Sequence, residues 1–289
     1  MSERIASTSG GASRSAHEPT ATARAIDDAR AFAATARVGF THVFAYRAEI
    51  VIQLLSAGIV AALNGSLWSV AISGRSAIAG VPSAEIFSYV IMAWVGVSVV
   101  ATRVNEEIGR RMREGLIAAD LLRPMTLQRF WYARDLGRAA ATLLVQTLPL
   151  FLACLLAFPV RLPSHAITWV FWFCALFLAH AVNYGLSFLV GLAALPFRNV
   201  SGLTHLKSTL VSIFSGALIP LALFPSWAQG VVSVLPFAAL AHAPATIFLE
   251  SETRVGSVLA GQAAWAIALW LLGQFAWERA ASRLTVQGG

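Results

Sequence analysis

The sequence predicts an all-α membrane protein with six transmembrane helices. Of its 289 residues, 57% are hydrophobic and only 12% are charged, and the mean hydropathy is +0.70. Soluble globular domains carry about twice that share of charged residues. Six uncharged stretches from residue 50 onward reach or approach the roughly 20 residues that cross a bilayer. The composition therefore excludes a soluble enzyme and a soluble nucleic-acid-binding protein.

Residues 1–29 are rich in Ser, Ala, Thr and Gly and contain no continuous apolar run. We therefore expect a disordered cytoplasmic tail there, followed by a transmembrane domain over residues 30–289. Between Arg30 and Arg47 apolar residues recur with the period of a helix, and one side of it carries Phe32, Ala36, Phe40 and Val43. This amphipathic pattern predicts an N-terminal interfacial helix that lies on the membrane surface.

The six predicted crossings are defined by the absence of charge. They cover residues 50–73, 86–102 and 139–158, a part of 166–195, and then 209–224 and 255–277. The stretch 208–249 is uncharged throughout and is long enough for one span or two. It is interrupted by Pro220, Pro225, Pro236 and Pro244. We therefore expect one crossing followed by a broken, re-entrant segment before the last helix, although charge alone argues only weakly against a seventh span.

Basic residues set the predicted orientation. With the N terminus inside, 18 Lys and Arg residues fall on the cytoplasmic side, and only Arg75, Arg161 and Arg254 fall outside. Positive charges near span ends are retained in the cytoplasm, so both termini are expected there. We read the net charge of +7 as a topology signal and not as a sign of nucleic-acid binding. The expected location is the cytoplasmic (inner) membrane of a bacterium.

The longest cytoplasmic loop, residues 103–138, has the pattern of a folded projection. Two i,i+4 pairs, Glu106 with Arg110 and Glu107 with Arg111, support a helix that Gly115 ends. A short helix over 116–122 follows, and Thr126 is placed to cap the helix into the third crossing. The loop's eight Arg residues suit simple anchoring to anionic lipid. Its apolar segment around an acidic Asp120 also suits docking of a cytoplasmic protein.

Ionisable residues inside a membrane would indicate ion-driven transport, and the predicted spans contain no Asp, Glu, Lys or Arg. Their polar residues include His180 and Asn183, which lie one helical turn apart. This spacing favours hydrogen bonding between helices over a substrate path. The candidates for a translocation path are nevertheless Asn64, Gln146, His180 and Asn183.

The sequence carries no motif for catalysis, a cofactor or a metal. Its one Lys-Ser pair, Lys207-Ser208, lacks the glycines of a phosphate-binding loop. The histidines are scattered without metal-ligand spacing, and there is no Gly-x-Ser-x-Gly nucleophile elbow. We therefore expect a non-catalytic chain that binds no cofactor or metal of its own.

Several segments resemble the ABC-2-type permease family, the membrane subunits of ATP-driven exporters. They are AYRAEI at 45–50, REGLIAADLLRP at 113–124, ARDLGR at 133–138, SGALIPLALFPSW at 215–227 and the ending RLTVQGG at 283–289. The resemblance implies a cytoplasmic coupling helix that touches the ATPase, with Glu114, Gly115, Asp120, Leu121, Leu122, Arg123 and Pro124 as its candidate contacts. It further implies an extracellular gate in the proline-interrupted segment, with Pro220, Pro225, Trp227 and Pro236 as candidates.

The same resemblance implies the partners of the chain. A separate ABC ATPase, the nucleotide-binding subunit, would bind ATP and Mg²⁺, and the permease would pair with a second copy or a similar permease as a homodimer or heterodimer. Membrane lipid is the remaining expected partner, and no nucleic acid is expected. The alternatives are a channel or secondary carrier for a small molecule, which needs no ATPase, and a membrane scaffold without transport.

Overall fold

The computed structural model describes residues 21–78, 81–123, 125–194 and 201–281. In these parts of the chain, five helical stretches are long and apolar enough to cross a membrane. They are Arg47–Ile72, Ser83–Arg113, Leu127–Ala157, Ala166–Leu192 and Val255–Ala281. They correspond to the first four predicted crossings and to the last, so the all-α membrane fold is confirmed.

The chain begins with α1 (Ala21–Ala45) and α2 (Arg47–Ile72), followed by a two-stranded antiparallel ribbon of β1 (Ala77–Ile78) and β2 (Val81–Pro82). Next come α3 (Ser83–Val100), α4 (Val104–Arg113), α5 (Ile117–Leu121), α6 (Leu127–Thr142), α7 (Leu148–Ala157) and α8 (Ala166–Leu192). The last part holds α10 (Ser201–Phe214), α11 (Ser226–Val234), α12 (His242–Phe248) and α13 (Val255–Ala281).

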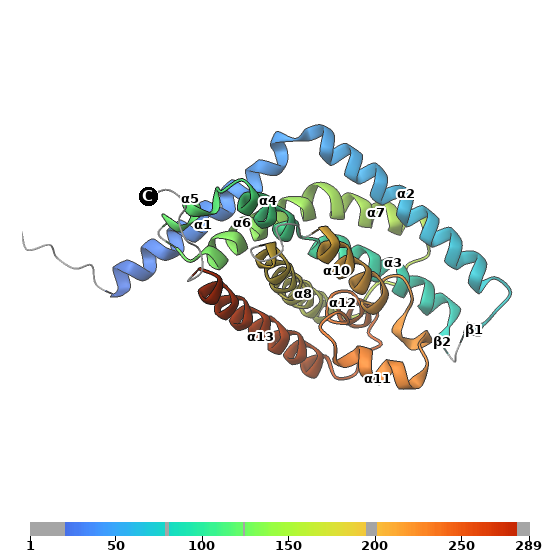
Figure 1. Ribbon diagram of the computed structural model, residues 1–289. Coiled ribbons are helices and arrows are strands. Elements are labelled where there is room, and N and C mark those ends of the chain that lie inside the picture. Colours follow the sequence, from blue (N-terminus) through green and yellow to red (C-terminus); the bar gives the residue numbers. More distant parts are fainter. Residues whose placement is uncertain (1–20, 79–80, 124, 195–200, 282–289) are drawn as a thin grey trace, which may run out of the picture.

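Helices α3 and α8 form the centre of the bundle, and α2 and α13 lie at its two opposite edges (Figure 1). Most residues of α3 and α8 are buried, whereas few of α2 and α13 are. The exposed side of α2 carries large apolar side chains, among them Leu55, Ile59 and Leu63. In a membrane protein such a surface meets lipid or another apolar helix, so the bundle has two unpartnered apolar edges.

The N-terminal helix differs from the prediction in extent. It begins at Ala21, so residues 21–29 are helical and do not belong to a tail, while residues 1–20 lie outside the described residues. Ala-rich sequence is a good helix former, and the tail prediction gave composition more weight than this propensity. Along its length α1 packs on α6, with the rings of Phe32 and Tyr132 6.4 Å apart.

Two glycines allow α1 and α6 to meet backbone to backbone. A Cβ atom added to Gly39 on α1 would lie 2.0 Å from the carbonyl oxygen of Arg134 on α6. Reciprocally, a Cβ atom on Gly137 of α6 would lie 1.8 Å from the carbonyl oxygen of Ala36 on α1. Small residues at such crossings let helices approach closely in membranes. No side chain fits at either position unless the helices separate.

Helices α6 and α7 are one continuous rod interrupted by a π-helical turn at Leu143–Thr147. Pro149 in the first turn of α7 accounts for it, because a proline ring clashes with the carbonyl group four residues earlier in an α-helix and lacks an N–H donor. The wider π turn relieves this clash. As a result, the charged residues of α6 and the uncharged third crossing belong to one continuous helical stretch.

The predicted fifth crossing is wrong in its limits. Helix α10 ends at Phe214, and the chain then turns at Gly216, whose φ of +86° is in the left-handed region. A Cβ atom on Gly216 would lie 2.3 Å from the Tyr89 hydroxyl oxygen. Pro220 and Pro225 then each precede a short helical turn. The helix therefore stops well before residue 224, where the prediction ended it.

Helix α10 nevertheless packs on α4 and α8. At its start the Thr204 hydroxyl oxygen accepts a hydrogen bond from Asn105 Nδ2 at 2.8 Å. Just past its end, the Ser215 carbonyl accepts from the amide of His242, whose ring Nδ1 lies 2.9 Å from the Tyr89 hydroxyl. The 14 residues of α10 correspond to about 21 Å of helix.

Between α10 and α13, within the described range 201–281, the structure contains only short helices. Helix α11 has 9 residues and α12 has 7, and neither is long enough to cross a membrane. Helix α12 is almost wholly buried and packs on α3 and α8. The broken character of this segment agrees with the sequence prediction, and the described residues contain no seventh span.

We expect Gly137→Ala to lower the thermal stability of the purified protein, because the added methyl group has to push α1 away from α6. The expected loss in unfolding free energy is about 1–3 kcal/mol, the usual cost of overpacking. Thermal unfolding in detergent measures it. Gly58→Ala on α2 is the control, because nothing lies within 4 Å of a Cβ atom there. Equal stability of the two variants would contradict the backbone contact.

Candidate functional site

The turn after α4 is closed by a glycine cap. Gly115 has a φ of +70°. The amide of Leu116 donates to the Arg111 carbonyl at 2.9 Å, and the amide of Gly115 donates to the Met112 carbonyl at 3.3 Å. This pair of bonds satisfies the last carbonyls of the helix and suits glycine at the left-handed position. The prediction that Gly115 ends this helix is confirmed.

Asp120 holds the short helix α5 against α4. Its side chain is fully buried, and Arg111 donates from Nε and Nη2 to its two carboxylate oxygens at 2.7 Å each. Arg123 donates from Nε to the same carboxylate at 3.2 Å. A guanidinium that binds both oxygens forms a strong, directional pair. Asp120 is therefore not on the surface of the projection, and it holds α5 from inside.

The two predicted i,i+4 pairs of α4 are not formed. Arg110 binds Glu107 and Glu114, both at 2.7 Å, and Arg111 turns to Asp120. The reason is the turn at Gly115, which folds α5 back onto α4 and presents Asp120 to Arg111. Glu107 also lies 3.9 Å from Arg134 on α6. The charged side chains of the loop thus join α4, α5 and α6 into one unit.

Two leucines remain exposed on this projection. Leu122 is 88% exposed and Leu116 is 42% exposed, on either side of the buried Asp120. Behind them the Arg123 guanidinium lies 4.1 Å from the centre of the Phe130 ring. The Thr126 hydroxyl accepts from the amide of Arg129 at 3.4 Å, so Thr126 caps α6 as predicted. The Leu121 side chain and Pro124 lie outside the described residues.

The candidates for a translocation path lie on three helical segments. Asn64 on α2 donates to Val60 of its own helix at 3.1 Å, and Gln146 lies half-buried in the π-helical turn. Asn183 on α8 is buried and donates to the Val100 carbonyl of α3 at 2.8 Å, so the interhelical hydrogen bond expected for it is confirmed. Among the described residues, no hydrogen bond joins Asn64 or Gln146 to the α8 pair.

Asp135 is the candidate that sequence reasoning missed. It lies on α6 with 3% of its side chain exposed, and its Oδ1 accepts from Arg138 Nη2 at 3.0 Å. Its Oδ2 lies 3.6 Å from Nε2 of His180, the buried path candidate on α8. The prediction began the third crossing at residue 139 and so left this carboxylate outside it. The i,i+3 spacing of Asp135 and Arg138 was the available signal.

The gate candidates are distributed along the broken segment. Pro220 is buried before a 3₁₀ turn, and Pro225 is exposed before α11. Trp227 is 76% exposed, and Pro236 is buried before the turn that leads to α12. This turn is held by Gln262 of α13, whose Nε2 donates to the Ala239 carbonyl at 2.8 Å. One end of the segment is therefore fixed to the bundle while Trp227 projects from it.

Glu250 joins the end of this segment to the start of α8. Its carboxylate accepts from the amide of His165 at 3.0 Å and from the Thr168 hydroxyl at 2.8 Å. These bonds, that of His165 above all, lower the pKa of Glu250 from 4.5 to about 2. The carboxylate thereby caps the N-terminus of α8, which has no cap from its own side chains. Its own φ of +56° marks the sharp turn that brings it there.

Comparison with known proteins identifies a family. Residues 43–288 match the model of a family described as ABC-2 family transporter protein. No curated protein matches the chain, and no solved structure does. In the described ranges, no three His, Cys, Asp or Glu side chains are placed to hold a metal ion.

We expect Asp120→Asn to loosen α5, because it leaves Arg111, which is only 16% exposed, without its charged partner. Breaking a buried pair in this way costs about 3–5 kcal/mol. Hydrogen–deuterium exchange of peptides over 114–123 should rise strongly. Asp28→Asn is the matched control, because its pair with Arg129 is exposed and contributes about 1 kcal/mol at most. If the exchange of these peptides is unchanged in the Asp120 variant, the Asp120–Arg111 pair does not hold α5 against α4.

Glu250 should make its segment sensitive to acid. Because the folded-state pKa of Glu250 is depressed, its contribution is fully present above pH 4.5 and is lost as the pH falls towards 2. Cleavage by pepsin near Phe248, normalised to an unfolded peptide, should accelerate over this window. Glu250→Gln should be cleaved rapidly at pH 4.5 as well as near pH 2. Glu252→Gln should show the pH dependence of the wild type. A wild-type profile for the Glu250 variant would refute the role of this carboxylate.

Proposed function

The chain belongs to the ABC-2 family of transporter proteins, and from this premise we propose that it is the permease subunit of an ATP-driven exporter. In this proposal the chain forms the substrate path in the membrane. A separate ABC ATPase binds ATP and Mg²⁺ and drives the transport cycle. The permease itself performs no hydrolysis.

The observation that carries the proposal is the way α5 is held. It is a short helix between two long helical stretches, Ser83–Arg113 and Leu127–Ala157, each of spanning length. The Asp120–Arg111 pair holds it against the end of the first stretch. Arg123, which also pairs with Asp120, lies over the Phe130 ring of the second stretch. A force on α5 therefore reaches two membrane spans without passing through a flexible linker. This is the property required of a coupling helix, and Leu122 and Leu116 offer the contact surface.

We also propose six crossings, with α10 as the fifth. Its 14 residues correspond to about 21 Å of helix, roughly two-thirds of the 30 Å hydrocarbon thickness of a bilayer. With six crossings both termini lie on one side, and the distribution of basic residues puts that side in the cytoplasm. We also propose that the protein lies in the inner membrane of a bacterium.

The exposed edges of the bundle support pairing of the permease. Helices α2 and α13 leave most of their apolar residues exposed, and a second copy or a similar permease would cover one of these edges. The substrate path is proposed to involve the candidates Asn64, Gln146, His180 and Asn183. The outer gate is proposed to lie at Pro220, Pro225, Trp227 and Pro236, where α11 projects from a fixed anchor at Gln262.

One observation favours a second candidate function, a secondary carrier. The buried carboxylate of Asp135 beside His180 gives the bundle an ionisable pair of the kind used in proton-coupled transport. Such a carrier would transport its substrate in liposomes without an ATPase. The exporter would require the second subunit and ATP, so a single reconstitution separates the two functions.

We expect Leu122→Asp to weaken association with the ATPase subunit by at least about tenfold, because a charge replaces the most exposed leucine of the α5 projection. Co-purification and the rate of ATP hydrolysis of the complex measure it. Leu162→Asp is the matched control, an exposed leucine in the loop between α7 and α8 on the proposed outer side. If both variants keep the ATPase and its activity, α5 is not the coupling helix.

A further inference from the structure

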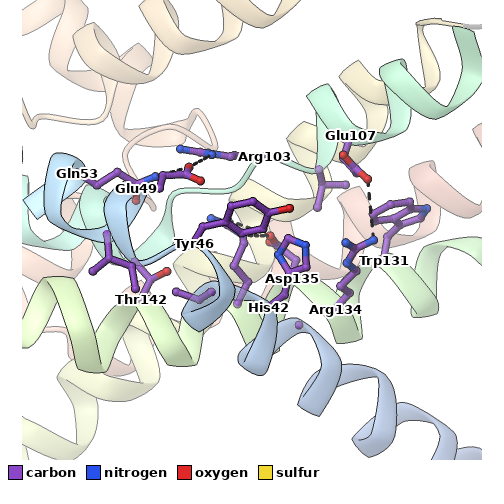
Figure 2. Close-up of a pocket in the computed structure, with 15 residues that line it drawn as sticks. His42, Tyr46, Glu49, Gln53, Arg103, Glu107, Trp131, Arg134, Asp135 and Thr142 are labelled. Atoms are coloured by element: carbon purple, nitrogen blue, oxygen red, sulfur yellow. Dashed lines mark hydrogen bonds and ion pairs between the residues drawn. The ribbon is translucent and has the colours of Figure 1, made fainter. Parts of the chain in front are cut away.

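A cavity of about 270 Å³ lies between α1, the start of α2, the α3–α4 turn and α6 (Figure 2). Glu49 and Arg103 stand at one end of it, and Trp131, Arg134 and Glu107 stand at the other. The close approach of α1 to α6 forms one wall of this cavity, since Gly39 and its neighbours line it. None of the sequence-predicted site residues line this cavity.

The cavity lies where the charged and the apolar parts of the helices meet. Arg103 lies three residues after Val100, the last residue of α3, and Arg138 directly precedes the uncharged run 139–158. Ile50 lines the cavity, and the next residue of α2, Val51, begins the exposed apolar side of that helix. In a membrane this is the depth of the lipid headgroups, and the apolar side of α2 leads from it into the hydrocarbon.

Two of the three arginines in the cavity are hydrogen-bonded to carboxylates. Arg103 binds Glu49, and Arg138 binds Asp135 together with the Ala101 carbonyl at 2.7 Å. These pairs neutralise the carboxylates that would otherwise repel an anion.

Arg134 differs from the other two arginines. It forms only a long ion pair with Glu107, at 3.9 Å between nitrogen and oxygen, which is too long for a hydrogen bond. Glu107 instead accepts two hydrogen bonds from Arg110. Arg134 stacks over Trp131 with 5.3 Å from its guanidinium carbon to the ring centre. Among the described residues its donors therefore have a fixed orientation and no hydrogen-bond partner.

A guanidinium with free donors in a partly enclosed site matches the oxygens of a phosphate group, which it binds with two parallel hydrogen bonds. Tyr46 and Trp131 provide amphipathic rings of the kind found at headgroup level. We propose that this cavity binds a phosphate group at Arg134, presented by a membrane phospholipid whose acyl chains follow the exposed side of α2. The proposal requires the membrane location alone and is independent of ATPase coupling.

The test uses the full-length protein purified in detergent with any subunits that accompany it. Dihexanoyl-phosphatidylglycerol is titrated, and binding is followed by calorimetry and by the shift of the unfolding temperature. We expect Arg134→Gln to bind at least about tenfold more weakly than the wild type, the loss typical of a charge-assisted hydrogen bond. Arg129→Gln should bind like the wild type, because Arg129 is on the same helix but outside the cavity.

Two further ligands separate the sources of the phosphate. Dihexanoylglycerol, which lacks phosphate, should bind much more weakly, and glycerol phosphate should also be weaker because it lacks the chains. If glycerol phosphate binds as tightly as dihexanoyl-phosphatidylglycerol, the ligand is a soluble phosphate compound and not a phospholipid. Equal binding of both lipids, or no effect of Arg134→Gln, would overturn the site. If that variant does not fold, Arg134→Lys serves instead, and an affinity equal to wild type would refute bidentate binding.

Discussion

The backbone contact between α1 and α6 is the constraint on which the cytoplasmic half of the structure depends. Gly39 and Gly137 bring the two helices closer than any side chain allows. Their separation in turn sets where α2 begins, since α2 follows α1 after a single residue. It also sets the width of the cavity that Arg134 faces. The carbonyl of Arg134 touches Gly39 while its side chain lines the cavity, so one residue couples the packing to the site.

Three buried amide side chains of the bundle donate hydrogen bonds to backbone carbonyl groups of neighbouring segments. Asn183 binds the end of α3, Gln128 binds the Trp270 carbonyl of α13 at 3.1 Å, and Gln262 binds the Ala239 and Ala175 carbonyls. Because the hydrocarbon contains no water, carbonyl groups of the protein are the acceptors available to such donors. These hydrogen bonds fix the rotation of the helices about their axes, which apolar contacts alone specify less well.

The sequence predicted features that depend on nearby residues, such as helix spans and caps. It did not predict contacts between residues that are far apart in the chain. Span length predicted five of the helices, and the identities of Gly115 and Thr126 predicted a helix end and a helix start, because caps act over four residues or fewer. The partner of Arg111 depends on a turn that reverses the chain, and the approach of Asp135 to His180 depends on how α6 and α8 are rotated. The end of α10 was missed because the turn at Gly216 packs closely against Tyr89, a contact between segments far apart in the chain.

The π-helical turn at Leu143–Thr147 has a consequence for how the sequence of this helix is constrained. It accommodates one residue more than an α-helical turn, which rotates everything beyond it by about 100°. The side of α6 that faces α1 therefore does not continue as the side of α7 that faces α2. Helices α6 and α7 therefore differ in the rotation of their side chains about the common helix axis. Substitutions can thus adapt the charged half and the membrane half to different neighbours independently, as if they belonged to separate helices.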